Sequence, residues 1–342
     1  MRSRAQCSEK NHLFCGNGKY SAIAFLNPEK RELLKGSIWI CLLFFIFAFA
    51  LTIAEAAASQ NLTANFIDVG QGDSILLQFK EKSILIDGGP PGMGARVEEY
   101  LRRQNISRLD LLILTHPHDD HIGGLITVLE DLPVKKAIDS GENDSSLIYK
   151  RFKALIAKKN ISYAPAYAGQ EIDLDPALKI EVLWPPSGGV SGGANLSRQA
   201  AIINPWESIV VRALSGDMNQ HSLVLRLTYG RISLLFMADA DTVVESSLIS
   251  SGANLSSQIL KVGHHGGTSA SSPDFLKRVR PAVGIISVGE ANYYGYPTRR
   301  TLSSLQAAGS SVYRTDTCGS IKITTDGLNY SISPEKSCGL PE

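Results

Sequence analysis

The sequence is short of histidine, of cysteine and of net charge. It has seven histidines and five cysteines, and 34 basic residues face 33 acidic ones. Seven of these basic and four of these acidic residues lie in the first 56 positions, which leaves 27 basic and 29 acidic residues for the rest of the chain. Such a balance excludes a broad attraction for polyanions, so nucleic-acid binding would need a local basic surface. The 44% apolar content is ample for a globular core.

Charge is absent altogether from residues 38–54, which read IWICLLFFIFAFALTIA. As a helix this run would extend roughly 25 Å, slightly less than the ~30 Å hydrocarbon core of a bilayer. Three basic residues precede it closely, namely Lys30, Arg31 and Lys35. The positive-inside rule then predicts a cytosolic N-terminal tail over residues 1–36, with a signal peptide or transmembrane anchor over residues 37–58. We therefore expect the remaining body to be membrane-anchored or secreted, outside the cytoplasm.

Short strands and helices alternate along that body. Three β patterns open it, ANFIDVG, DSILLQF and KSILIDGG, and a helical stretch at residues 95–104 leads into an apolar strand at residues 109–115. The alternation then repeats, which fits two sheets with helices outside. Residues 187–206 are rich in Gly and Ser and predict an inserted loop. We expect one domain over residues 63–330 and a C-terminal tail over residues 331–342.

Two cysteines, Cys318 and Cys338, lie in this body. In an oxidising compartment they could form a disulfide, and two unpaired thiols are the alternative.

The scarce histidines are concentrated in a few places. Three of the seven lie in the segment THPHDDHIGG, directly after the apolar strand, and most of the others lie near later predicted strands, at His221 and at residues 264–265. The side chains that could bind a metal in the first segment are His116, His118, Asp120 and His121. Imidazole nitrogens together with a carboxylate suit a borderline metal such as zinc. We therefore predict a metal site here rather than a solvated turn.

The HxHxDH pattern after a strand resembles the metallo-β-lactamase superfamily. Further segments, in the same order, resemble the C-terminal domain of ComEC-type DNA-uptake proteins and their stand-alone relatives: FIDVGQGDSILLQF, ILIDGG, NQHSLVLRL, LLFMADAD, LKVGHHGGTSASS and SVGEANYYGYP. The resemblance covers about residues 63–327. It implies an α/β fold, an αββα sandwich with two divalent metal ions at one edge of the sheets, zinc in the first place and manganese as the alternative.

The resemblance also implies roles for individual residues. His116 and His118 would hold one metal ion and Asp120 and His121 the other. The bridging carboxylate would be Asp239, and the late histidine ligand would be His264, with His265 as its replacement or neighbour. The expected catalytic residues are Asp120, Asn219 and His265. The expected partners that orient the ligands are Asp68, Asp73 and Asp87, for which turn formation beside glycine is the alternative. The expected substrate contacts are Ser222, Thr268, Tyr296, Arg299 and Arg300, although the two arginines could also be solvated.

Three residues depart from the family pattern. Asn219 stands where many superfamily members have a further histidine ligand. Ala238 replaces the glycine that usually precedes the bridging carboxylate, a change we expect to be tolerated if the backbone there has a negative φ. Tyr296 replaces the histidine of a G-H-P motif, which puts one step of the family mechanism in doubt.

These features predict a metal-dependent phosphodiesterase that acts on extracytoplasmic nucleic acid, in the first place single-stranded DNA. One alternative is an envelope hydrolase of a small ester, lactone or phosphoester, which the neutral body and Tyr296 favour. Another is a degenerate domain that binds a metal ion or ligand without turnover.

Overall fold

The computed structural model describes residues 39, 41–46, 61–142, 144–187 and 218–338. Internal contacts divide the chain into residues 1–58 and residues 59–342. In the first unit, residues 41–46 are helical, and no described helix is both long enough and apolar enough to cross a membrane. The predicted N-terminal tail, and all but the first residue of the predicted inserted loop, lie outside the described residues.

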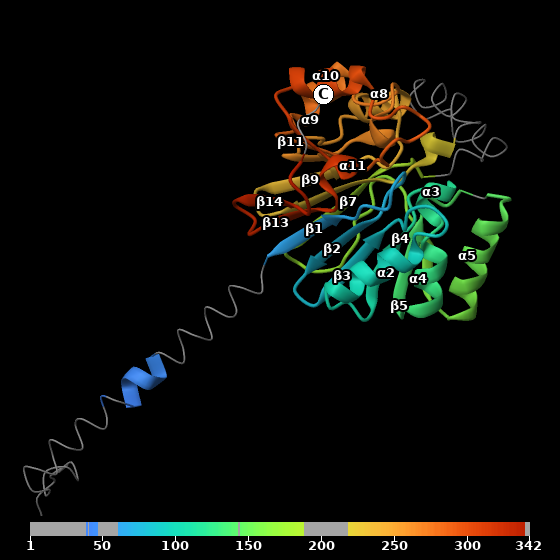
Figure 1. Cartoon of the computed structure of the whole chain (residues 1–342). Helices are drawn as coiled ribbons and strands as arrows, with labels where there is room; N and C mark the ends of the chain where they lie inside the picture. The colour runs from blue at the N-terminus through green and yellow to red at the C-terminus, as the bar shows by residue number, and fades with distance from the viewer. Residues whose placement is uncertain (1–38, 40, 47–60, 143, 188–217, 339–342) are drawn as a thin grey trace, which may run out of the picture. The chain divides into compact units, whose positions relative to one another are not determined.

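Two mixed β-sheets form the second unit (Figure 1). The first sheet has the order β14-β13-β1-β2-β3-β4-β5-β6, and the second has the order β12-β11-β10-β9-β8-β7. The strands of the first sheet are β1 (Leu62–Phe66), β2 (Ile75–Phe79), β3 (Lys82–Ile86), β4 (Leu109–Ile113), β5 (Val134–Asp139), β6 (Ser162–Pro165), β13 (Ile321–Thr325) and β14 (Tyr330–Pro334). Those of the second are β7 (Leu178–Trp184), β8 (Val224–Tyr229), β9 (Ile232–Phe236), β10 (Ile259–Lys261), β11 (Val283–Ile286) and β12 (Ser311–Arg314).

The two sheets follow the same plan. Each opens with three antiparallel strands, β1–β2–β3 in the first and β7–β8–β9 in the second. Each then continues with parallel strands, β3 to β6 and β9 to β12. Parallel neighbours need crossover connections, and helices provide them here. The carboxyl ends of the parallel strands therefore lie together at one edge of each sheet.

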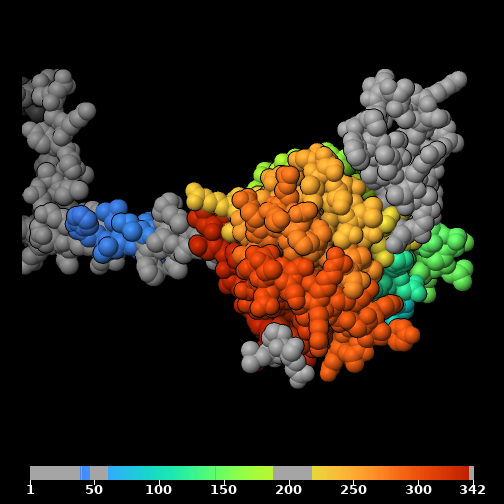
Figure 2. Space-filling view, turned by 90° about the horizontal axis from the view of Figure 1, so that it is seen from above, coloured from blue at the N-terminus to red at the C-terminus, as the bar shows by residue number. Residues whose placement is uncertain are grey.

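Helices cover the outer face of each sheet. The first sheet carries α2 (Gly94–Arg103), α4 (Leu125–Asp131) and α5 (Leu147–Lys158), and the second carries α8 (Thr242–Ser250), α9 (Pro273–Val279) and α10 (Arg299–Ala307). The short helices are α3 (Asp119–Ile122), α11 (Thr315–Cys318) and the 3-10 turns η2 (Met218–His221) and η3 (Gly263–Gly266). Figure 2 shows that the C-terminal half of the chain, in yellow to red, forms most of the visible face of the body.

The hydrophobic cores follow from the strand alternation. In β4, Leu111 and Ile113 point into the core between the sheets, and Leu112 points into the core beneath the helices. Strands buried on both faces read as continuous apolar runs, which is why LDLLILT has no clear polar side. The layers are therefore helices, sheet, sheet and helices, in agreement with the predicted fold.

The chain returns to the first sheet at its C-terminal end. After β12, strand β13 pairs with β1, and β14 pairs with β13 at the edge of the sheet. The segment 331–342, which we expected to be a tail, thus contributes residues 331–334 to a strand. Cys318 and Cys338 form a disulfide, and it links α11 to the chain after β14.

Candidate metal centre

The candidate metal centre lies at the edge where the parallel strands of both sheets end. Asp87 follows β3, His116 follows β4, Asp239 follows β9 and His265 follows β10. Ligand sites in open α/β sheets form outside the carboxyl ends of strands, because the loops there diverge and leave room. Residues more than a hundred positions apart in the sequence meet here for that reason.

The turn that holds Asp120 and His121 depends on close backbone packing. A Cβ atom on Gly72 would lie 2.2 Å from the carbonyl oxygen of Asp120. Gly72 also has a φ of 134°, a conformation that L side chains rarely adopt. The following residue, Asp73, donates its N–H to the same oxygen at 3.2 Å. Glycine at position 72 therefore lets the β1–β2 loop press against α3 and fix its orientation.

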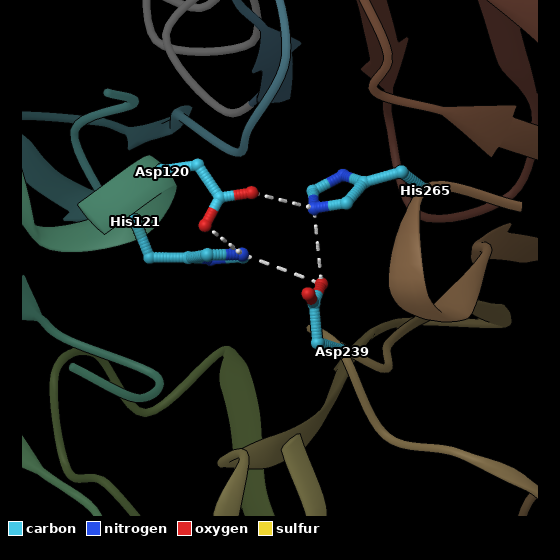
Figure 3. Close-up of side chains that lie close together, drawn as sticks. All are labelled: Asp120, His121, Asp239 and His265. Carbon is cyan, nitrogen blue, oxygen red and sulfur yellow. Dashed lines mark ion pairs between the residues drawn. The ribbon is translucent and has the colours of Figure 1, made fainter. Parts of the chain in front are cut away.

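Four side chains converge at the centre of this edge (Figure 3). His121 Nε2 and His265 Nε2 each lie 3.3 Å from Asp239 Oδ1. His265 Nε2 also lies 3.2 Å from Asp120 Oδ2, and His121 Nε2 lies 4.0 Å from Asp120 Oδ1. The figure shows the two imidazoles and the two carboxylates pointing toward one another from α3, η3 and the loop after β9.

The chemistry of these atoms fits a cation. His121 Nε2, Asp239 Oδ1 and His265 Nε2 are buried and have no hydrogen-bond partner among the described residues. Buried polar atoms are normally satisfied, so a group of unsatisfied ones that point at a common centre needs an explanation. A divalent ion bound between two imidazoles and two carboxylates provides one.

A second group shares Asp239 with the first. His116, His118 and Asp239 lie close enough together to hold an ion. His116 Nε2 lies 3.0 Å from His118 Nδ1 and 3.9 Å from Asp239 Oδ2. Asp239 offers Oδ1 to one group and Oδ2 to the other, the position that a bridging carboxylate occupies. The residues therefore fit two neighbouring ions.

Buried hydrogen bonds orient the histidines from behind. His121 Nδ1 lies 2.8 Å from Asp87 Oδ2, and Thr115 donates to the same carboxylate from its N–H and its hydroxyl. His265 Nδ1 lies 2.9 Å from the Ser287 carbonyl oxygen. A carbonyl can only accept, so this nitrogen carries the proton and leaves Nε2 free to face Asp239. Partners of this kind fix the tautomer and the ring orientation of a metal-binding imidazole.

Lys261 is a member of the centre that the sequence analysis missed. Its side chain is fully buried, and its ammonium pairs with Asp73 and donates to the Ala238 carbonyl at 3.0 Å. Asp73 in turn lies 3.6 Å from His265 Nδ1 and 3.9 Å from His121 Nδ1. A lysine inside the apolar strand ILKV was a signal for a paired buried charge, because an unpaired one is too costly to bury.

Four residues of the site have a left-handed backbone conformation. Asp87, Ala238, His264 and His265 have φ values of 57°, 47°, 45° and 51°, in the left-handed region that is uncommon for residues other than glycine. Ala238 therefore does not meet the negative φ that we made a condition for replacing glycine, and the alanine is held there at some cost. Such strain persists where the surrounding structure fixes the backbone, commonly at functional sites.

The electrostatic balance keeps Asp239 charged and the imidazoles of His121 and His265 protonated when no cation is bound. Burial would lower the pKa of His265, but Asp239 and Asp120 raise it to about 9. Burial would likewise lower the pKa of His121, but Asp239 and Asp87 raise it well above its usual value. Burial would raise the pKa of Asp239, yet His265 and His121 hold it well below the ordinary range. Protons thus occupy positions that a metal ion would take over.

The structure separates His264 from His265. His265 is buried and belongs to the central group, whereas His264 is half-buried and its Nε2 lies 3.8 Å from Asp239 Oδ2. Figure 3 shows the His265 ring directed at Asp120 and Asp239. His265 is therefore the better candidate for the late ligand that we expected at His264.

A cavity of about 520 Å³ opens over the centre. Its lining combines the candidate ligands with a rim of other residues: Gln71, Pro117, His118, Asp119, Asp120, Asp144, Ser146, Met218, Asn219, Asp239, His264, His265, Tyr294 and Tyr296. Asn219 and Tyr296, both predicted from the sequence, thus face the same space as the candidate ligands. Burial and the nearby Asp239 raise the pKa of Tyr296, so its phenol stays protonated at neutral pH. The volume lies within the usual range for small-ligand sites.

Other predicted residues lie elsewhere. Ser222 is buried and does not line the cavity; its hydroxyl accepts from the N–H of Asp239 at 3.3 Å and lies 3.5 Å from His116 Nδ1. Arg300 donates to the carbonyl of the exposed Thr268, and neither they nor Arg299 line the cavity. Asp68 pairs with Arg96 at 2.9 Å and accepts from the N–H of Gly70, away from the imidazoles. Of the three expected orienting carboxylates, Asp73 and Asp87 thus lie at the centre.

Comparisons with known proteins agree with this architecture. Residues 67–193 match the family model described as the metallo-beta-lactamase superfamily. The ComE operon protein 3 of Bacillus subtilis is 27% identical over 86% of this chain and 37% of its own length. The Competence protein ComA of Neisseria gonorrhoeae is 29% identical over 78% of this chain and 33% of its own length. The chain thus spans about a third of the length of these relatives.

A solved structure shows a similar fold. The metallo-beta-lactamase fold protein YhfI from Bacillus subtilis superimposes with a TM-score of 0.50 and 14% identity, over 78% of this chain and all of its own. The chain therefore has a metallo-β-lactamase fold, with candidate metal ligands at the sheet edge, and it resembles the ComEC-type competence proteins.

Proposed function

We propose that the chain is a metal-dependent phosphodiesterase that cleaves single-stranded nucleic acid outside the cytoplasm. The observation that carries the proposal is the convergence of unsatisfied buried nitrogen and oxygen atoms beneath an open cavity. Two divalent ions, zinc in the first place, would be held by His116, His118 and Asp239 on one side and by Asp120, His121, Asp239 and His265 on the other. When bound, such ions supply Lewis-acid activation of water and of phosphoryl oxygens.

The protein's own residues would position the reactants. Asp120 has the most accessible carboxylate of the central group, so it can accept a hydrogen bond from the attacking water and orient it. Asn219 and the protonated phenol of Tyr296 line the cavity and can donate to the oxygens of a phosphodiester. Donors held in place before the reaction stabilise the charge that develops in its transition state.

Metal analysis together with two assays tests this proposal. We expect the purified full chain to bind up to two equivalents of zinc or manganese. The loaded protein should hydrolyse bis-p-nitrophenyl phosphate and single-stranded DNA, and excess EDTA should abolish both activities. A protein that binds metal but cleaves neither phosphodiester would refute the proposed activity, and one that binds no metal would refute the assigned centre.

A second candidate function is the hydrolysis of a small ester, lactone or phosphoester in the cell envelope. The cavity lining favours it in one respect, since four aspartates and no lysine or arginine are among the lining residues. Such a wall would not attract a long polyanion electrostatically. Hydrolysis of p-nitrophenyl acetate or of a simple lactone, without cleavage of DNA or of bis-p-nitrophenyl phosphate, would favour this function. Metal binding without turnover on any of them would indicate a binding domain.

We also propose that the body lies outside the cytoplasm, anchored or exported through residues 37–58. The disulfide between Cys318 and Cys338 supports this location, because such bonds persist in oxidising compartments. The two cysteines should resist alkylation in cells until a reductant is added. A reporter that is active outside the cytoplasm should also work when fused after residue 342. Free thiols in the native protein, together with a reporter that is active only inside, would refute the location.

A further inference from the structure

A row of aromatic rings runs from the metal centre to the surface. Tyr296 meets the edge of His264 with ring centroids 5.5 Å apart, and Tyr294 stacks on Tyr296 at 5.5 Å with an interplanar angle of 21°. Tyr293 continues the row with its ring centroid 6.3 Å from that of Tyr294. Tyr294 and Tyr296 line the cavity that Asp120 and Asp239 also line. The row therefore forms one wall of the candidate active site.

The side chain of Asn292 holds the loop that carries these rings in place. The Asn292 side chain accepts from the N–H of Tyr296 at 3.0 Å and donates to its carbonyl. The same amide donates to the Gly289 carbonyl at 3.0 Å. The Tyr296 ring packs on Gly267, where a Cβ atom would lie 2.9 Å from the ring. Tyr296, on which Tyr294 stacks, is thus held in place before any ligand arrives, which lowers the entropy cost of binding.

The outer rings are not part of the hydrophobic core. Tyr293 is fully exposed and Tyr294 is 63% exposed, although large aromatic side chains are usually mostly buried. Neither phenol has a hydrogen-bond partner among residues 61–142, 144–187 and 218–338. Two exposed aromatic side chains beside the candidate active site offer a surface for a flat apolar group.

We propose that Tyr294, supported by Tyr296 and Tyr293, is a stacking platform for an unpaired nucleobase next to the scissile phosphate. This inference rests on the proposed phosphodiesterase function and names how that site would select its substrate. Every base has a π-face, so stacking tolerates any sequence but requires an unpaired base. Stacking also supplies attraction that does not depend on charge. Such attraction offsets the repulsion between the aspartates of the cavity wall and the phosphates of the substrate. A duplex, whose bases are already stacked, would gain nothing from the platform.

The test compares two ligands of equal charge. The zinc-loaded full chain is titrated with a fluorescent ten-nucleotide phosphorothioate of thymidine, which resists hydrolysis, and with an abasic phosphorothioate of the same length. Because both carry the same phosphates, the ratio of their dissociation constants isolates the contribution of the bases. We expect the thymidine oligomer to bind about tenfold more tightly, as one stacked base provides.

Variants show which residue is responsible. Tyr294→Ala should bring the ratio close to one, and Tyr294→Phe should preserve it because the ring remains. Leu328→Ala is the matched control, since Leu328 is also 63% exposed but lies between β13 and β14. Equal binding of both oligomers by the unchanged protein, binding of neither, or an unchanged ratio in Tyr294→Ala would overturn the platform. If the unchanged protein binds the two oligomers with the expected ratio but does not cleave ordinary single-stranded DNA, the phosphodiesterase proposal alone would be overturned.

Discussion

The two halves of the body build the candidate centre in different ways. The first sheet supplies most of its candidate ligands from one short segment, His116 to His121, in which Asp87, itself held by Thr115, orients His121 from behind. The second sheet supplies single residues from the ends of separate strands, Asp239 after β9 and His265 after β10. It also supplies the strained backbone at Ala238 and the aromatic wall. The first half therefore supplies most of the candidate ligands, and the second adds Asp239, His265 and the aromatic side of the cavity.

The largest effect should come from removing ligands of the first half. The double variant His116→Ala/Asp120→Ala takes one ligand from each candidate ion, so at least one equivalent of zinc and all hydrolysis should be lost. Metal analysis by mass spectrometry and the bis-p-nitrophenyl phosphate assay measure this. His221→Gln is the control, because His221 is buried but pairs with Glu142 at 2.9 Å outside the metal groups. Full zinc occupancy in the double variant would contradict the assignment.

Lys261 tests whether the second half stabilises the first through charge. Lys261→Met should lower the free energy of unfolding by about 3–5 kcal/mol, because it leaves Asp73 buried without its partner. Urea denaturation of the metal-free protein measures the change. Lys277→Met is the matched control. Lys277 pairs with Asp274 at 3.3 Å on the surface, where the loss should stay within about 0.5 kcal/mol. Equal losses in the two variants would show that Asp73 does not need the ammonium.

Asp87 tests the orienting role of the first half. Asp87→Asn should weaken zinc binding by about 10- to 100-fold, because the amide orients His121 less firmly than the carboxylate does. Competition with a chromogenic chelator measures the affinity. Asp139→Asn is the control: Asp139 is also a buried carboxylate at a strand end of the same sheet, but it accepts from Tyr149 and Tyr163. The Asp139→Asn variant should be less stable than the unchanged protein but should bind zinc with the same affinity. The same zinc affinity in both variants would argue against a special role for Asp87.

The smallest expected effect concerns Tyr296, on the substrate side of the second half. Tyr296→His restores the family's imidazole and should raise the rate on phosphodiesters by roughly tenfold, less than the full benefit of a well-placed general acid. Steady-state kinetics on bis-p-nitrophenyl phosphate measure it. A lower rate on another substrate, with phosphodiester cleavage unchanged, would indicate that the phenol is an adaptation to that substrate. No change on any substrate would make Tyr296 a packing residue.

The sequence alone determined the layered α/β fold, and it located the first cluster of histidines. Both follow from local patterns, because a buried parallel strand is continuously apolar and its end places consecutive polar residues at one edge. It could not decide between His264 and His265, since that choice depends on a left-handed turn at both residues.

Tertiary structure alone decided the long-range contacts. The pairing of Lys261 with Asp73, the position of Ser222 behind His116 and the packing of the Tyr296 ring on Gly267 each depend on how distant parts of the chain pack. Local sequence carries no signal for the partner of a buried charge or for the direction of a side chain across two sheets. The physical reason is that these contacts form only once the hydrophobic core between the sheets has fixed their distance and register.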